Sequence, residues 1–225
     1  MVTTLPISKI KVKYRPFVIK EQKALLLAQE SKDRDTILST IVDVLKSCSD
    51  GDIDPDKVPA ADLAYFFVQL RIASVGPEVK FTIGCSSCGT PNTINMQLTD
   101  ITLECPPIVT DIKLTDTVGV TFRLPTMTDA LVKDDNRDKS TYILYRLVET
   151  MYDEDSVYQK SDYTYEEFEE WLGMLNEQQL LRIEQYVNSI PELTHTLEFD
   201  CHQCKTKNRR LLEGLHSFFR FDVGA

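Results

Sequence analysis

The sequence predicts an α+β fold, and three observations lead to this prediction. Apolar residues recur with a period near 3.6 over much of residues 21–76, a spacing typical of helices. After Pro77 the period changes to 2, which is typical of strands. Two Cys-x-x-Cys pairs lie next to alternating segments of this kind, one pair in each half of the chain.

Composition and charge narrow the class of protein. The chain has 225 residues, of which 42% are hydrophobic and 27% are charged, and this balance excludes disordered and collagen-like proteins. Lys and Arg total 25 against 35 Asp and Glu, so the formal net charge is -10. Because such a chain is repelled by phosphate, the composition disfavours binding to nucleic acid or to an anionic membrane through the whole surface.

The cysteines are expected to be reduced. No run of 18 apolar residues is present, and residues 1–6 lack the charged and apolar regions of a signal peptide. We therefore expect a cytosolic protein, in which six cysteines are thiols or metal thiolates rather than disulfides.

The N-terminal part, residues 1–76, is predicted to be an extended segment followed by helices. Residues 7–19 alternate partially and contain Pro16, which indicates an extended segment or an edge strand. The periodicity then predicts three helices, at residues 21–31, 35–47 and 59–75. Asp35 is the predicted cap of the second helix, and Gly76 ends the third.

A calcium loop is the alternative for the acidic segment 50–56, but its sequence does not fit. Counted from Asp50, the positions that require glycine and glutamate hold Pro55 and Ala61. A solvated turn is therefore the preferred interpretation.

Both Cys-x-x-Cys pairs are predicted to lie at the tips of β-hairpins. Residues 80–83 and 93–98 flank the first pair, and residues 197–199 and 211–212 flank the second. Superposing Cys85 on Cys201 also superposes Cys88 on Cys204, together with the pairs Thr90 and Thr206, and Asn92 and Asn208. The sequence therefore contains two related units, each made of a strand, a Cys-x-x-Cys turn and a second strand. We call the two turns, Cys85–Cys88 and Cys201–Cys204, knuckles.

These two units predict one discontinuous zinc ribbon. Zn²⁺ in structural sites is held tetrahedrally by four thiolates, and the predicted ligands are Cys85, Cys88, Cys201 and Cys204. The ribbon halves would be residues 77–100 and 193–225, with residues 101–192 inserted between them. Because the four cysteines fill the coordination shell, the Zn²⁺ would be structural.

Alternatives to the shared site remain open. A redox dithiol would be expected beside a βαβ unit, and two local disulfides would require an oxidising compartment. His202 lies between the second pair of cysteines and is the alternative ligand, although an exposed position is favoured. Cys48 and Cys105 are expected to be buried thiols.

The inserted domain, residues 101–192, is predicted to contain strands and then helices. The strand candidates are residues 101–103, 112–114 and 118–124, and the region 126–190 is predicted to be helical. Thr164 and Glu167 form a capping box at the start of one helix, and a second helix spans residues 176–189. The first of these helices carries an apolar stripe made of Phe168, Trp171, Leu172 and Leu175. This stripe is interpreted as internal core, with a partner-binding surface as the alternative.

A second candidate surface is the basic cluster Lys205, Lys207, Arg209 and Arg210. These cations offset the negative charge of a four-thiolate zinc site, or alternatively bind nucleic acid or an acidic protein. Phe218, Phe219 and Phe221 near the C-terminus are candidates of the same kind, packing on the domain or on a partner.

The sequence shows no recognisable catalytic motif. Gly-x-x-x-x-Gly-Lys, Gly-x-Gly-x-x-Gly, Gly-x-Ser-x-Gly and His-Glu-x-x-His are all absent, and the three histidines all lie after residue 194. We expect a binding or scaffolding protein rather than an enzyme.

Several short segments resemble a known viral family. They are Leu5-Pro6, Arg15-Pro16-Phe17 with Lys20-Glu21, Leu70-Arg71, Ser74-Val75-Gly76 and Cys85-Ser86-Ser87-Cys88. Together these segments, mainly in the first hundred residues, resemble a baseplate protein family of T4-like contractile-tailed phages, described as a baseplate hub subunit or hub assembly chaperone. The resemblance implies a late viral protein of the host bacterial cytoplasm that helps to build the hub through contacts with hub and tail proteins. A permanent structural subunit of the virion and a zinc-ribbon nucleic-acid binder are the alternatives.

Overall fold

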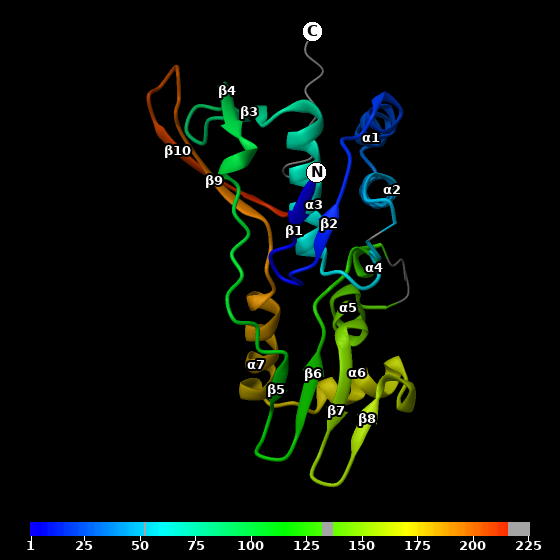
Figure 1. Ribbon diagram of the computed structural model, residues 1–225. Helices are drawn as coiled ribbons and strands as arrows, with labels where there is room; N and C mark the ends of the chain where they lie inside the picture. The colour runs from blue at the N-terminus through cyan, green and yellow to red at the C-terminus, as the bar shows by residue number, and fades with distance from the viewer. Residues whose placement is uncertain (52, 132–136, 216–225) are drawn as a thin grey trace. The chain divides into compact units, whose positions relative to one another are not determined.

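The computed structural model describes residues 1–51, 53–131 and 137–215 (Figure 1). The chain divides into two compact units, with unit 1 comprising Met1–Glu104 and Glu192–Ala225 and unit 2 comprising Cys105–Pro191. Both units contain helices and sheets, which confirms the α+β class. The three C-terminal phenylalanines, Phe218, Phe219 and Phe221, lie outside the described residues.

Three helices form the N-terminal part of unit 1. They are α1 (Ile19–Ser31), α2 (Arg34–Cys48) and α3 (Ala60–Val75), with Gly76 ending the last. The cap of α2 is Asp33, whose carboxylate accepts a hydrogen bond from the Thr36 amide, so the prediction of Asp35 is wrong. Lys32 adopts a left-handed conformation that ends α1 and leaves Asp33 extended, as an N-cap residue must be. Asp35 lies in the first turn, where its charge favours the helix dipole.

A short antiparallel ribbon precedes these helices. Its strands are β1 (Val2–Thr4) and β2 (Lys11–Lys13), so the extended segment begins earlier than the predicted residue 7. The turn between the strands is held by Asp62 of α3, a fully buried carboxylate that accepts hydrogen bonds from the amides of Ile7 at 2.8 Å and Ser8 at 2.7 Å. A buried acceptor on a helix thus fixes the N-terminal ribbon to α3.

Replacing Asp62 with alanine is expected to destabilise unit 1 by about 2–4 kcal/mol, because two buried amides lose a charged acceptor. Denaturant unfolding followed by far-UV circular dichroism measures this change. The matched control is Asp43→Ala, at an exposed position on α2. Equal unfolding midpoints for the two variants would show that Asp62 does not hold the ribbon.

Two further hairpins complete unit 1 and confirm the predicted hairpin positions. The strands are β3 (Glu78–Gly84), β4 (Pro91–Gln97), β9 (Thr194–Asp200) and β10 (Lys207–Glu213). The closing pairs are Gly84 with Pro91 and Asp200 with Lys207, so both Cys-x-x-Cys segments lie in the connecting loops. The short 3-10 helix η1 (Leu98–Asp100) follows β4. The predicted strand at residues 101–103 is wrong, since this segment forms only an isolated bridge between Thr102 and Thr194.

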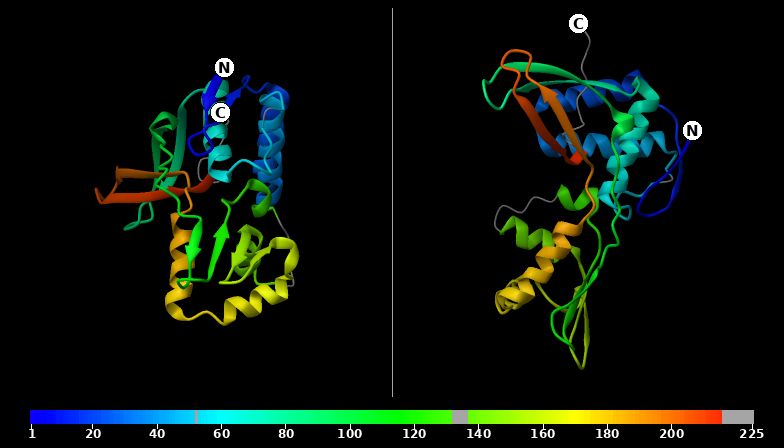
Figure 2. Two further views of the ribbon diagram at one scale, coloured as in Figure 1. Left: turned by 60° about the horizontal axis from the view of Figure 1, so that its bottom comes forward. Right: turned by 90° about the vertical axis from the view of Figure 1, so that its left-hand side faces the viewer.

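Unit 2 is a four-stranded antiparallel sheet with helices packed on it (Figure 2). The strand order is β5 (Asp111–Lys113), β6 (Gly119–Phe122), β7 (Val148–Tyr152) and β8 (Val157–Gln159). The helical elements are α4 (Met127–Ala130), α5 (Lys139–Leu147), η2 (Lys160–Asp162), α6 (Tyr165–Gly173) and α7 (Glu177–Ser189). Among the described residues, no helix has the length and apolar character needed to cross a membrane.

The prediction that residues 126–190 are helical is wrong for β7 and β8. β7 begins directly after α5 and lies between β8 and β6, and β6 precedes it in the chain by more than twenty residues. Pairing with a distant strand overrides a local preference, because sheet formation depends on neighbours that the local sequence does not contain. The predicted capping box at Thr164 and Glu167 is confirmed.

The core of unit 2 is aromatic. The rings of Phe122 and Tyr186 stack with centroids 4.6 Å apart, and Phe168 is fully buried in the same cluster. The other members of the apolar stripe, Trp171, Leu172 and Leu175, are partly buried and pack against this cluster. The stripe therefore contributes to the core of unit 2.

Candidate metal centre

The two hairpins of unit 1 bring four cysteines together, although the pairs are separated by more than a hundred residues in the chain. The Sγ atoms of Cys85, Cys88, Cys201 and Cys204 all lie within 4.8 Å of one another. The Sγ atoms are 3.6 Å apart between Cys85 and Cys204, and 3.7 Å apart between Cys88 and Cys201. A tetrahedron with Zn–S bonds of about 2.3 Å has S–S edges of about 3.8 Å, so these separations suit one tetrahedral metal ion.

The same backbone turn presents each pair of sulfurs. The Cys85 amide donates to the Thr90 carbonyl at 2.9 Å, and the Gly89 amide donates to the Cys85 carbonyl at 3.0 Å. In the second knuckle, the Cys201 amide donates to the Thr206 carbonyl at 2.9 Å, and the Lys205 amide donates to the Cys201 carbonyl at 3.0 Å. Gly89 and Lys205 both have a positive φ, of 72° and 59° respectively. This turn requires a residue in the left-handed conformation, which glycine adopts without strain in the first knuckle. In the second knuckle the same conformation costs Lys205 a small backbone strain, because its side chain disfavours a positive φ.

Two buried asparagines connect the hairpins to each other. The Asn92 Nδ2 group of β4 lies 3.7 Å from the Cys201 sulfur, and the Asn208 Nδ2 group of β10 lies 3.5 Å from the Cys85 sulfur. Asn92 Oδ1 accepts from the His202 amide at 2.9 Å, and Asn208 Oδ1 accepts from the Ser86 amide at 2.8 Å. Each hairpin therefore contacts the knuckle of the other one through an equivalent side chain.

Neighbouring hydrogen-bond donors favour the thiolate form of the two buried cysteines. The amides of Cys88 and Ser87 lower the pKa of Cys85 to about 6, with a further contribution from Asn208. The Cys204 amide is the main cause of a lowered pKa at Cys201. At Cys204, Thr206 acts to lower the pKa, but the sulfurs of Cys88 and Cys85 and burial outweigh it, so the pKa is raised. Because metal ligands must be deprotonated, these donors suit a metal site.

The other thiol and imidazole groups considered as candidates, His202, Cys48 and Cys105, are not members of the four-cysteine cluster. His202 is exposed, and its Nδ1 lies 2.9 Å from the Asn92 oxygen. Cys48 is fully buried as predicted, and burial raises its pKa to about 11. The prediction that Cys105 is buried is wrong, because it lies in an irregular segment between η1 and β5 and is exposed.

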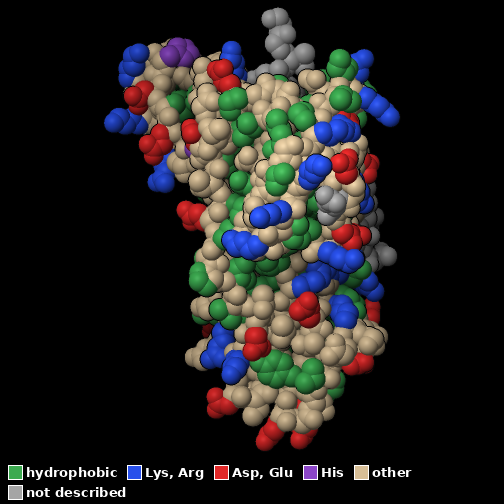
Figure 3. All heavy atoms as spheres, viewed as in Figure 1, with side chains coloured by type: hydrophobic (Ala, Val, Ile, Leu, Met, Phe, Trp, Pro, Cys, Tyr) green, Lys and Arg blue, Asp and Glu red, His purple; other side chains and the backbone are tan. Residues whose placement is uncertain are grey.

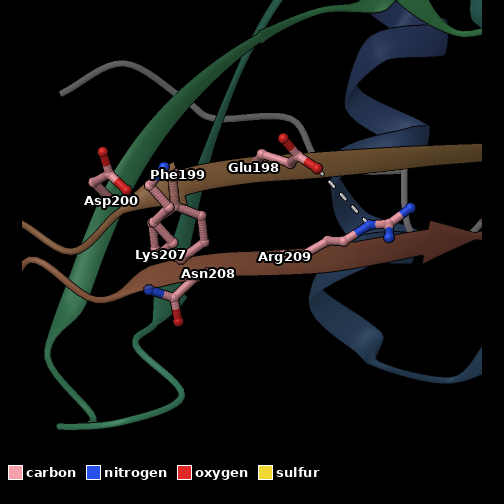
Figure 4. Close-up of a pocket in the computed structure, with 6 residues that line it drawn as sticks. All are labelled: Glu198, Phe199, Asp200, Lys207, Asn208 and Arg209. Carbon is pink, nitrogen blue, oxygen red and sulfur yellow. Dashed lines mark ion pairs between the residues drawn. The ribbon is translucent and has the colours of Figure 1, made fainter.

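The basic cluster lies on the second hairpin and is mixed with acidic side chains. Lys205, Lys207, Arg209 and Arg210 are all exposed. Lys207 pairs in register with Asp200, and Arg209 Nε lies 3.9 Å from Glu198 Oε1 (Figure 4). Figure 3 shows Lys and Arg interleaved with Asp and Glu over the hairpins. Because two of the four cations face carboxylates across the strands, the positive charge of the cluster is partly offset.

One face of this hairpin is hollowed. The hollow has a volume of about 360 Å³ and is lined by Glu198, Phe199, Asp200, Lys207, Asn208 and Arg209 (Figure 4). Its lining of both signs of charge gives no preference for an anionic or a cationic ligand. The partner-binding roles of the basic cluster and of the apolar stripe (Phe168, Trp171, Leu172 and Leu175) stay predictions.

Asn92 and Asn208 were not predicted from the sequence to have a role at the site. The signal was present, because the superposition of the two cysteine pairs also matched these asparagines and the threonines two residues before them. A residue type that recurs at the same sequence distance from both cysteine pairs is expected when its side chain interacts with those cysteines.

Comparison with known proteins adds the family. A family model described as T4 bacteriophage base plate protein matches residues 1–220. No curated protein and no solved structure matches the chain. The family match thus covers both hairpins, all four clustered cysteines and the whole of unit 2.

Proposed function

This chain belongs to the T4 bacteriophage base plate protein family, and we propose that within this family it is a non-enzymatic assembly factor, a chaperone, for the hub of the baseplate. The observation that carries the proposal is the family match over residues 1–220. A baseplate protein has other phage tail or baseplate proteins as partners, and the proposal makes the hub proteins the partners of this chain. It would act in the host bacterial cytoplasm while the tail is assembled.

The second part of the proposal is a structural Zn²⁺ held by Cys85, Cys88, Cys201 and Cys204. Four sulfurs in a tetrahedral arrangement suit zinc, or iron as the main competitor. The four thiolates would use every position of a tetrahedral ion and leave none for a substrate or a water molecule. This closed shell supports a structural role for the metal and a protein that acts by contact rather than by turnover.

The proposed metal would also stabilise the two hairpins by joining them. Neither hairpin alone is expected to be stable in water, because an isolated two-stranded hairpin is marginal at best. A zinc ion shared between them would hold segments from both halves of the chain in one unit, since loop closure costs grow only logarithmically with loop length. The surface offered to hub proteins would then depend on the metal.

Co-expression with the phage hub and tail proteins, followed by affinity capture, tests the assembly role. We expect affinity capture of the wild-type chain to recover at least one hub protein, and we expect the hub protein to be recovered chemically unchanged. Mass spectrometry of purified particles separates the two structural alternatives, since an assembly factor is absent or scarce there and a permanent subunit is stoichiometric. Capture of no tail protein would overturn the proposed function.

The same preparation tests the metal. Elemental analysis is expected to find one zinc per chain and no stoichiometric iron. The control is Cys105→Ser, which removes an exposed thiol outside the cluster and should leave the zinc content unchanged. If the protein instead contained one iron per chain, the proposal of zinc would be wrong and the bound metal would be iron.

A further inference from the structure

The contacts of Asn92 and Asn208 use both ends of each side-chain amide. Each Oδ1 accepts from an amide of the opposite knuckle, and each Nδ2 donates to the carbonyl of a threonine in its own hairpin, Thr90 or Thr206 at 2.8 Å. The second Nδ2 hydrogen is then left for the sulfur of the opposite hairpin. Because backbone amides only donate and carbonyls only accept, the orientation of both side chains is determined.

The polar groups beside the four sulfurs divide them into two kinds. The buried sulfurs of Cys85 and Cys201 each face an asparagine of the other hairpin. The exposed cysteines, Cys88 and Cys204, instead have a threonine hydroxyl of their own hairpin 3.3 Å from the sulfur. Water can replace a hydroxyl at an exposed sulfur, but it cannot easily replace a donor at a buried one.

From this arrangement we propose that Asn92 and Asn208 are positioning residues of the metal centre, each of which controls metal affinity through a cysteine of the opposite hairpin. The inference rests on the metal site of the proposed function. An ion with four thiolates carries a net negative charge, and a donor aimed at a buried sulfur offsets part of it. The same side chains dock the hairpins in the binding geometry, so their loss both leaves more of the negative charge of the buried sulfurs uncompensated and separates the two ligand pairs.

The test measures metal affinity of the full-length protein by competition with a chelator, using Zn²⁺, and by the thiolate charge-transfer absorption of bound Co²⁺. The variants are Asn92→Asp and Asn208→Asp, which keep the acceptor oxygen and lose the donor. Each is expected to lower metal affinity by about 10- to 100-fold and to weaken the Co²⁺ absorption. Asn208→Leu, which is similar in size and uncharged, is expected to lower affinity as well and separates loss of the donor from added charge.

Asn95→Asp is the matched control, because it adds the same charge to the same strand as Asn92 at an exposed position. Its affinity is expected to stay within about twofold of wild type. Asn92→Ser and Asn208→Ser replace any Asp variant that fails to fold, with the same expected loss.

The outcomes separate the inference from the metal proposal. If wild-type protein binds the metal tightly and the folded Asn92 and Asn208 variants bind as well as Asn95→Asp, only the role of the asparagines is overturned. If wild-type protein takes up neither Zn²⁺ nor Co²⁺ in stoichiometric amount, the metal centre and the role of the asparagines are both overturned, while the hub assembly role is still decided by affinity capture.

Discussion

Replacing Cys201 with serine is expected to release the metal and to unfold or loosen unit 1 as a whole, not only its C-terminal hairpin. Binding of structural zinc contributes on the order of 10 kcal/mol or more, which is comparable with the total stability of a domain. Cys201 is fully buried, and its sulfur lies 3.7 Å from the sulfur of Cys88 in the other hairpin. Losing this proposed ligand would therefore remove the connection between two distant segments.

The effect on unit 1 can be measured separately from unit 2. Trp171 is the single tryptophan, and it packs against the core of unit 2, so its fluorescence reports on that unit. Thermal unfolding followed by circular dichroism should show a large decrease in the melting temperature of unit 1 in the Cys201→Ser variant. Removing the metal from the wild-type protein with a chelator should cause the same decrease. Cys105→Ser is the control, at an exposed cysteine outside the cluster. A Cys201→Ser protein that melts like the wild type would refute the shared metal site.

Replacing Asp129 with alanine is expected to destabilise unit 2 by about 3 kcal/mol, because breaking a buried ion pair leaves its partners uncompensated. The Asp129 side chain is 2% exposed, and its two oxygens lie 2.7 Å from Arg123 Nη1 and 3.1 Å from Arg146 Nε. The carboxylate also accepts from the Thr126 amide at 2.8 Å. The two arginine side chains are each 32% exposed, so water relieves part of the cost.

The same carboxylate predicts a loss of stability in acid. Burial alone would raise the pKa of Asp129, but the hydrogen bonds from Arg123 and Thr126 lower it to about 2. Because this value lies below the ordinary 3.8 of the unfolded chain, the stabilisation is complete above about pH 4 and is lost as the pH falls through 2. The shift corresponds to about 2 kcal/mol.

Urea unfolding followed by Trp171 fluorescence at pH 6 and pH 2.5 measures this dependence. Asp129→Asn should reduce the difference between the two pH values by about 2 kcal/mol, whereas Asp116→Asn, at an exposed turn, should leave it unchanged. If Asp129→Asn shows the same acid sensitivity as the wild type, another group is responsible.

Local sequence patterns predicted much of the fold. The period of apolar residues located α1, α2 and α3, and the change of period located the hairpins around each cysteine pair. The capping box at Thr164 was predicted correctly because its two hydrogen bonds join residues three positions apart. The strand β7 was missed because it pairs with β6, which is distant in the chain, and β8 was missed with it because β8 pairs with β7.

The two Cys-x-x-Cys knuckles, the repeat that relates them and the resemblance to a baseplate family could all be recognised from the order of residues alone. A knuckle is encoded locally, since its turn joins residues within five positions of each other. The folded chain was needed to show that the four sulfurs lie within 4.8 Å of one another and that Asn92 and Asn208 contact the opposite hairpin. Those contacts join residues more than a hundred positions apart, and they depend on the packing of unit 1 rather than on any preference of the neighbouring residues.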